Sequence, residues 1–218
     1  MMNILRDVLA ILVRMIQSFL GQSSYPTLSV NAEDAVLVIL DPLETYRYTF
    51  KDLRPLRRLM AEAKSRGVPI VRTRWVRTRG SVDDIVNAKG HWTEFVSSDR
   101  EPFLEDLEEG DADLSVAFAD AFAPLPRELR ESAEDGKEIT SLQDLMEERG
   151  ASVLVLAGTW AEACVERTAY SACTKGYVPI VVRPAVGGHW VDPTLARMDM
   201  VYASVVEDVV FLQDTESE

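Results

Sequence analysis

The sequence predicts an α/β protein with a three-layer α/β/α sandwich, built around a mostly parallel, doubly wound sheet. Short apolar runs, typical of strands buried on both faces, alternate with segments of helical periodicity. Glycine-containing turns separate many of these segments. The chain has 218 residues, of which 47% are hydrophobic and 27% charged, and this suffices for one domain with one core. We therefore expect an α/β domain over residues 34–210, preceded by a helical extension over residues 1–21.

The expected elements alternate along the chain. The run "AVLVILD" (35–41) predicts a buried strand, and "LRPLRRLMAEAKSRG" (53–67) predicts a helix with a glycine C-cap. The remaining expected elements are strands at 68–76 and 113–118, a helix at 141–150, a strand at 152–158, a helix at 161–175, a strand at 177–183 and a short strand near 201–206. Residues 21–33, rich in Ser, Pro and Thr, are expected to form a loop.

The N-terminal stretch "MMNILRDVLAILVRMIQSFLG" has apolar residues at helical spacing and predicts an amphipathic helix of about five turns. Arg6, Asp7 and Arg14 interrupt it, so it is neither a membrane span nor a convincing signal peptide. The helix could pack on its own domain, on a sister subunit or on a membrane surface; little basic charge on its polar face disfavours the membrane. The apolar positions are Leu5, Val8, Leu9, Leu12, Ile16 and Phe19.

The charge and the cysteines restrict partners and compartment. The net charge of -13 repels phosphate backbones and anionic lipids, so we expect no nucleic-acid partner. The only cysteines, Cys164 and Cys173, are nine positions apart in one predicted helix, about 13 Å along its axis, which is too far for a disulfide. A reducing cytoplasm fits this composition.

In a parallel sheet, ligands bind at the carboxyl ends of the strands, so residues that follow strands are the candidates for a site. Asp41 follows the first strand, an arginine group (Arg72, Arg74 and Arg77) lies at the end of the second, and the turn from Gly158 to Cys164 follows the fourth. The arginines could bind an anionic part of a substrate, or they could be a solvated strand end.

Cys164 falls in the first turn of the helix that follows a strand. There the unpaired backbone N–H groups and the helix dipole favour a thiolate, which is a nucleophile, and the same N–H groups could stabilise an oxyanion. A carboxylate delivered by a neighbouring strand end, as Asp41 would be, could move the proton. The alternative is a buried cysteine that only fills the core, which is how we interpret Cys173.

Four stretches resemble the isochorismatase-like cysteine hydrolases, a family that includes nicotinamidases and N-carbamoylsarcosine amidases. They are "LVILD" ending in Asp41, "LRRLMAEAKSRGVPIVRTR", "TSLQDLMEERGASVLVLAG" and "CVERTAYSACTKGYVPIVV". The resemblance runs from about residue 34 to residue 207, and its specific part is the block from Thr140 to Val182.

The resemblance implies a hydrolase that cleaves the C–N bond of a small amide or ureido compound, without a cofactor. It implies that Cys164 is the nucleophile and Asp41 the general base, with an oxyanion hole from the N–H groups of Trp160 and Cys164 and a cis peptide bond between Thr159 and Trp160. It also implies a homo-oligomer. Phe122, in the family's small-residue-Phe pair, is a candidate for substrate binding.

The sequence departs from the family's pattern at the third catalytic residue, a lysine. The expected position falls at Val116, or at Ser115 or Ala117 if the register slips, and none of these carries a charge. Leu43 replaces a glutamine, and Ala161 replaces a threonine. Two hypotheses follow. Either an arginine supplies the positive charge in an active hydrolase, or the chain is a catalytically reduced member that serves as a small-molecule binding or assembly module.

We expect no bound metal. The family's zinc-binding members use an aspartate and histidines near the second strand, whereas this chain has only His91 and His189, and neither lies at a ligand spacing. Each histidine precedes a tryptophan in a polar loop. Both could line a pocket or lie on the surface.

Overall fold

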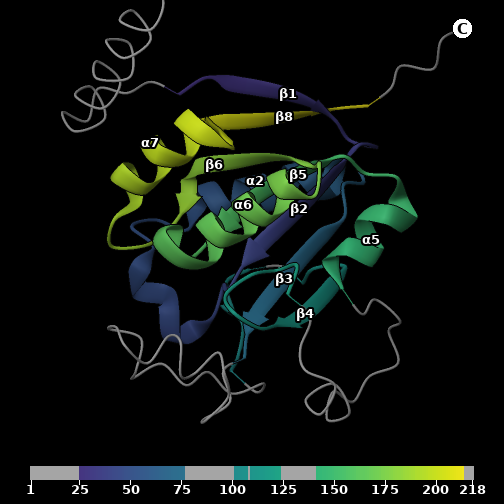
Figure 1. Ribbon diagram of the computed structural model, residues 1–218. Helices are drawn as coiled ribbons and strands as arrows, with labels where there is room; N and C mark the ends of the chain where they lie inside the picture. Colours follow the sequence, from purple (N-terminus) through teal and green to yellow (C-terminus); the bar gives the residue numbers. More distant parts are fainter. Residues whose placement is uncertain (1–24, 77–100, 108, 124–140, 214–218) are drawn as a thin grey trace, which may run out of the picture.

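The computed structural model describes residues 25–76, 101–107, 109–123 and 141–213, and these residues form a parallel sheet between two helical layers (Figure 1). The six strands follow the order β4-β3-β2-β5-β6-β7, and every neighbouring pair is parallel. The predicted three-layer α/β fold is confirmed. The strands of this sheet are β2 (Ala35–Leu40), β3 (Ile70–Trp75), β4 (Ala112–Val116), β5 (Val153–Gly158), β6 (Val178–Val186) and β7 (Ser204–Val206).

The strand order changes direction between β2 and β5. From β2 the chain adds β3 and then β4 on one side, and from β5 it adds β6 and then β7 on the other. The two central strands pair from Ala35↔Val153 to Leu40↔Gly158. Their carboxyl ends are therefore adjacent, at the topological switch point where ligands bind in sheets of this kind.

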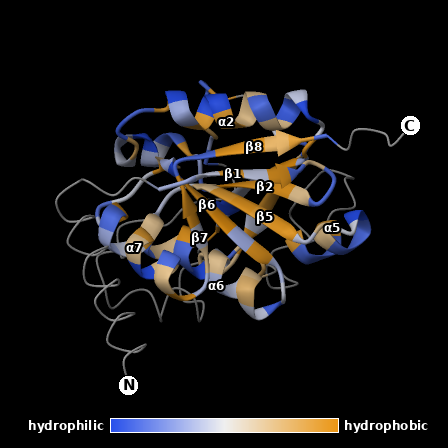
Figure 2. Ribbon diagram, turned by 90° about the horizontal axis from the view of Figure 1, so that it is seen from above, coloured by the Kyte–Doolittle hydropathy of each residue, from blue (hydrophilic) through white to orange (hydrophobic). Residues whose placement is uncertain are grey.

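Each face of the sheet has its own apolar core, and the alternation along β2 feeds both. Val36, Val38 and Leu40 pack with the helices α5, α6 and α7, whereas Leu37 and Ile39 pack with α2. Seen from above, the apolar strands lie between α2 on one side and α6 on the other (Figure 2). The helices are α2 (Arg54–Ser65), α5 (Leu142–Arg149), α6 (Glu166–Thr174) and α7 (Val191–Val201), with a 3-10 helix η1 (Glu44–Thr49) and a π-helical turn η3 (Ala161–Val165).

Local sequence signals set the ends of α2 and α5. Pro55 occupies the first turn of α2, where its missing N–H costs no hydrogen bond, and Gly67 follows the helix at φ +71°. Ser141 caps α5 by accepting the N–H of Asp144 at 3.1 Å, and Gly150 ends the helix in the left-handed region. Both helices were predicted from the sequence, and the terminal glycines were the end signals that the prediction used.

The sequence analysis missed two strands and one helix. The expected loop at 21–33 contains a strand, β1 (Thr27–Asn31), which pairs in parallel with β8 (Asp208–Leu212) in a separate two-stranded sheet. Only Val30 of β1 is buried, so no apolar run marks the strand. Helix α7 was not predicted either, because its 11 residues bury only three side chains. The helix expected at 1–21 lies outside the described residues.

Among the described helices, none is both long enough and apolar enough to cross a membrane.

Candidate active site

Asp41 directly follows β2 and is completely buried, with its backbone in the left-handed region at φ +46°. Two of its hydrogen-bond partners lie on β3. The carboxyl oxygen Oδ1 accepts the backbone N–H of Trp75 at 2.6 Å, and the Asp41 N–H donates to the Thr73 hydroxyl at 3.3 Å. The second oxygen, Oδ2, is buried and makes no hydrogen bond to a nitrogen or oxygen atom of the described residues. The neighbouring strand thus fixes the carboxyl group and leaves one oxygen for another partner.

Gly158 ends β5 and lets that strand approach β2 closely. Its φ is +105°, and a Cβ atom at this position would lie 2.1 Å from the Leu40 carbonyl oxygen. The next peptide bond, between Thr159 and Trp160, is cis, as the resemblance implied. The Thr159 hydroxyl lies 2.9 Å from that of Thr49, at the end of η1. The turn that precedes Cys164 is therefore attached to the segment that follows Asp41.

Trp160 is buried, and aromatic rings from two other segments surround it. Its ring contacts Tyr46 and Tyr48 of η1 edge-on, at centroid distances of 5.8 and 5.9 Å, and the His189 ring at 4.8 Å. Tyr48 is 59% exposed, whereas Tyr46 and Trp160 are each 1% exposed. The aromatic cluster therefore runs from the buried turn of Cys164 to the surface.

Cys164 lies in η3 and is buried beside Asp41. The two side chains affect each other's ionisation through a hydrogen bond and through charge. The backbone N–H of Trp160 also hydrogen-bonds to the sulfur. The structure thus brings together three groups that the sequence analysis selected: the carboxyl group of Asp41, the thiol of Cys164 and the N–H of Trp160.

Burial dominates the electrostatics of this pair. It raises the pKa of the Asp41 carboxyl from 3.8 to about 7, although the Cys164 thiol and the Trp75 N–H each lower it. Burial also raises the pKa of the Cys164 thiol well above 9.0, and the Asp41 carboxylate raises it further. The expectation of a thiolate from the helix N-terminus is therefore wrong for this state. Around neutral pH the sulfur keeps its proton, and the carboxyl group is the group that titrates.

The arginine group does not form an ion pair with Asp41 within the described residues. Arg72 forms a bidentate ion pair with Asp113, at 2.7 and 2.8 Å, and stacks on the Phe103 ring. Arg74 stacks on the same ring and donates to the Glu101 carbonyl oxygen. Its charge nevertheless lowers the pKa of Asp41, so Arg74 acts on the carboxyl group of the site. Arg77 lies outside the described residues.

The position expected for the family's lysine is apolar in the structure. Val116 ends β4 and is buried, as is Ala117 after it. Ser115, the third candidate position, is polar but uncharged. The positive charge that acts on Cys164 comes instead from Arg167, on the same stretch of helix, whose guanidinium donates to the Phe118 carbonyl oxygen at 2.6 Å. The loss seen in the sequence is therefore not compensated on β4.

Phe122 is buried, and its observed ring contacts lie at the far end of the cysteine helix. It stacks on Tyr177 at 5.7 Å, and the Lys175 ammonium lies 5.6 Å from its ring. Both of these residues follow the end of α6, whereas Cys164 precedes its start. The structure does not bring Phe122 and Cys164 together through any described contact.

The described residues contain no group of three or more potential metal ligands. His189 packs on Trp160, and its backbone N–H donates to Glu162, while His91 lies outside the described residues. Sequence reasoning missed the aromatic cluster and the two β3 residues that hold Asp41. Strand parity could have indicated Thr73, because it lies between Arg72 and Arg74 on β3 and so faces the opposite side of the sheet from them.

Comparison with known proteins assigns the family. Residues 51–207, well over half of the chain, match the isochorismatase domain family. Maleamate amidohydrolase from Pseudomonas putida is 34% identical over 110 residues, which are 48% of this chain and 51% of that protein. The chain thus matches about half the length of this curated relative.

Solved structures share the fold. An isochorismatase from Pseudomonas putida KT2440 has a TM-score of 0.56 at 19% identity, covering 87% of this chain and 94% of its own. N-carbamoylsarcosine amidase from Thermoplasma acidophilum has a TM-score of 0.59 at 20% identity, covering 79% and 95%. A cysteine hydrolase from Pseudomonas syringae pv. phaseolicola 1448A has a TM-score of 0.62 at 14% identity, covering 86% and 93%. At these identities the structures support the fold, and the domain match over residues 51–207 establishes that this chain belongs to the isochorismatase family.

Proposed function

We propose that this protein is a cysteine-dependent amidohydrolase that cleaves the C–N bond of a small carboxamide or ureido compound. The observation that carries the proposal is the buried pair of Asp41 and Cys164. A carboxyl group with a pKa of about 7 lies against a thiol, and a backbone N–H points at the sulfur. A general base works best when its pKa is near the working pH, and burial gives Asp41 that value. The amidohydrolase and amidase among the related proteins support the same reaction class.

In the proposed reaction, ionised Asp41 takes the proton of Cys164 as the sulfur attacks the carbonyl carbon. The N–H groups of Trp160 and Cys164 stabilise the negative charge that forms on the carbonyl oxygen. Protonated Asp41 then gives its proton to the leaving nitrogen, the C–N bond breaks, and an amine or ammonia departs from a thioester. A water molecule, deprotonated by Asp41, attacks the thioester and restores the thiol. The net reaction is amide plus water to carboxylic acid plus amine or ammonia.

The test is ammonia release from a panel of primary carboxamides and N-carbamoyl compounds that includes maleamate and nicotinamide. We expect turnover that Cys164→Ala and Asp41→Asn abolish, with the Cys173→Ala variant active as the matched control. The value of kcat/KM should rise with pH and level off above about pH 7, because only ionised Asp41 can accept the proton. Acid quenching should trap a thioester on Cys164, detectable by mass spectrometry.

The second candidate is a small-molecule binding or assembly module, and the apolar residues at the position of the lysine favour it. Val116 and Ala117 place no charge beside Asp41 and Cys164, and loss of one member of a catalytic unit commonly costs orders of magnitude in rate. A panel compound that binds by calorimetry but is neither hydrolysed nor trapped on Cys164 would support the module and contradict the hydrolase.

A further inference from the structure

Exposed apolar side chains gather where α6, α7 and the start of β6 meet. Tyr170 on α6 is 58% exposed, Val178 at the start of β6 is 50% exposed, and Met200 and Val201 at the end of α7 are 40% and 70% exposed. We call these four residues the α6–α7 patch. Single exposed apolar residues are common on protein surfaces, but a contiguous group of them marks a contact site.

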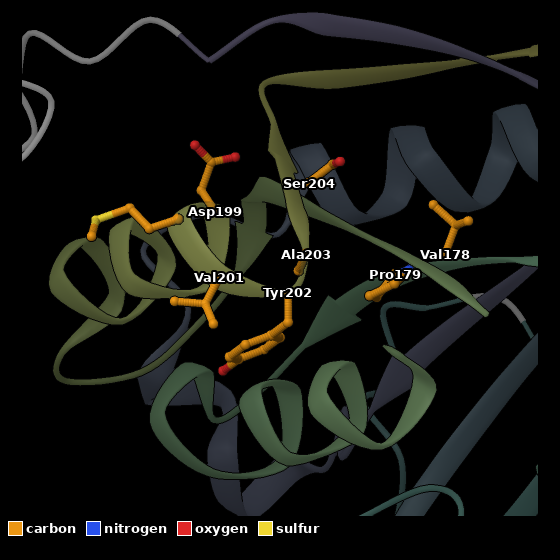
Figure 3. Close-up of a pocket in the computed structure, with 8 residues that line it drawn as sticks. Val178, Pro179, Asp199, Val201, Tyr202, Ala203 and Ser204 are labelled. Carbon is orange, nitrogen blue, oxygen red and sulfur yellow. The ribbon is translucent and has the colours of Figure 1, made fainter. Parts of the chain in front are cut away.

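An open pocket of about 260 Å³ continues the patch, formed by the start of β6, the end of α7 and β7 (Figure 3). The side chain of Tyr202 points from the end of α7 toward α6. Its ring meets that of Tyr170 edge-on at 5.6 Å, and its hydroxyl donates to Glu166 at 3.0 Å. The tyrosines therefore join the two helices into one apolar surface. None of the residues that line the pocket belongs to the site around Cys164.

The chain enters the described fold beside α7, the helix that carries part of this surface. The ring of Tyr25 lies 6.0 Å from the Arg183 guanidinium of β6, and the Pro26 carbonyl oxygen accepts the N–H of Glu207 at 2.8 Å. Figures 1 and 2 both show the start of β1 beside α7. The 24 residues that precede Tyr25 are therefore attached beside the start of α7, where Arg183 pairs with Asp192, about 13 Å along that helix from Met200 and Val201 of the patch.

We propose that residues 1–24 of the same chain cover the α6–α7 patch, with the stripe formed by Leu5, Val8, Leu9, Leu12, Ile16 and Phe19 packed against it. A helix of about 20 residues is about 30 Å long, and three or four extended residues add about 10 Å of linker. That reach is sufficient to lay the stripe across α7 and on to α6. In this contact the apolar stripe of the segment and the α6–α7 patch cover each other, so both surfaces are removed from water.

The first test is cross-linking in the full-length chain, with the exposed native Cys173 on α6 as one partner. Cys173 is one turn from Tyr170, and Met15 flanks the apolar stripe, so a Met15→Cys variant should be joined to Cys173 by a short bismaleimide. The control carries Met15→Cys, Cys173→Ala and Ser65→Cys, because the exposed Ser65 lies on α2, on the opposite face of the sheet.

A mixture of isotopically heavy and light chains shows whether the segment that covers the patch comes from the same chain or from a second copy. A cross-link within one chain, with a yield independent of protein concentration, is the expected result. Cross-links between heavy and light chains would assign the surface to a second copy and overturn the proposal. A yield no greater than that of the Ser65→Cys control would also overturn it.

A second test changes the surface instead of the segment. Val201→Lys should increase the rate of tryptic cleavage after Arg14 about tenfold, because one apolar contact of the segment is lost. Leu212→Lys is the matched control, since Leu212 is 45% exposed at the far end of β8. Equal cleavage rates in both variants would contradict the proposal, and the folded domain can be checked in each by circular dichroism.

Discussion

Replacing Asp41 by Asn should change how the stability of the protein depends on pH. In the folded protein burial raises the pKa of this carboxyl from 3.8 to about 7, whereas in the unfolded chain it returns to its ordinary value. Between these two values the folded state holds a proton that the unfolded state has lost, so stability falls as pH rises and becomes constant above about pH 7. At 1.36 kcal/mol per pH unit, the difference amounts to about 4 kcal/mol. Asn has the same shape and does not titrate, so the free energy of unfolding of the Asp41→Asn variant does not fall in this way as pH rises.

The assay is urea unfolding of the native protein and of Asp41→Asn from about pH 4 to about pH 8, with the difference in free energy of unfolding plotted against pH. Other titrating groups cancel in the difference when they are distant from Asp41. The native protein should lose about 4 kcal/mol relative to the variant over this range. Asp52→Asn is the control: the pKa of the partly exposed Asp52 is lowered from 3.8, so this carboxyl is ionised in both the folded and the unfolded chain over most of the pH range, and its difference should be nearly flat. Parallel curves for Asp41→Asn would refute the raised pKa and, with it, the role of burial.

Three further predictions concern single residues. Iodoacetamide should modify Cys164 much more slowly than the exposed Cys173 in the native protein, and unfolding should remove the difference, as peptide mass spectrometry would show; equal native labelling rates near pH 7 would contradict the raised thiol pKa. Gly158→Ala should lower the free energy of unfolding by more than about 3 kcal/mol, because its Cβ would overlap a carbonyl oxygen of β2. Gly176→Ala, with open space around it, should lower it by about 1 kcal/mol, as thermal unfolding would show. Equal losses would contradict the close approach of β5 to β2. Arg72→Met should lower the free energy of unfolding by about 1 to 2 kcal/mol through loss of its bidentate ion pair, and an unchanged urea midpoint would show that the pair contributes nothing.

The central strands and the place of the site could be predicted because both depend on local patterns. A continuous apolar run predicted β2, a second predicted β5, and the rule that ligands bind at strand ends then brought Asp41 and Cys164 together. The partners of these residues could not be predicted in the same way. Trp75 donates a backbone N–H, which any residue could supply, and the Tyr46 ring reaches Trp160 only because two distant turns meet.

The thiolate was predicted wrongly because a sequence reveals a helix terminus but not the depth of burial. The favourable effect of the terminus on a thiolate is about 1 kcal/mol, whereas desolvation of a buried charge is several times larger. In the structure desolvation is the largest influence on both Cys164 and Asp41. The contacts of the arginines depended on a second unknown, the position of Phe103, because both Arg72 and Arg74 lie over its ring.

The turn that carries Cys164 is bonded on both of its sides, and this restricts how a ligand can arrive. The Gly187 N–H donates to the Gly158 carbonyl oxygen at 2.9 Å, and the Ala161 N–H donates to the Gly187 carbonyl oxygen at 2.8 Å. Amide protons in such a turn should exchange slowly with solvent. Among the described residues, the exposed rings that contact Trp160 are those of Tyr48 on η1 and His189 after β6, so rotation of these side chains would open the turn without breaking its hydrogen bonds. In the proposed reaction the sulfur would then stay in place while surface rings turn aside, and a substitution at such a ring would change the rate of substrate entry without changing the position of the thiol.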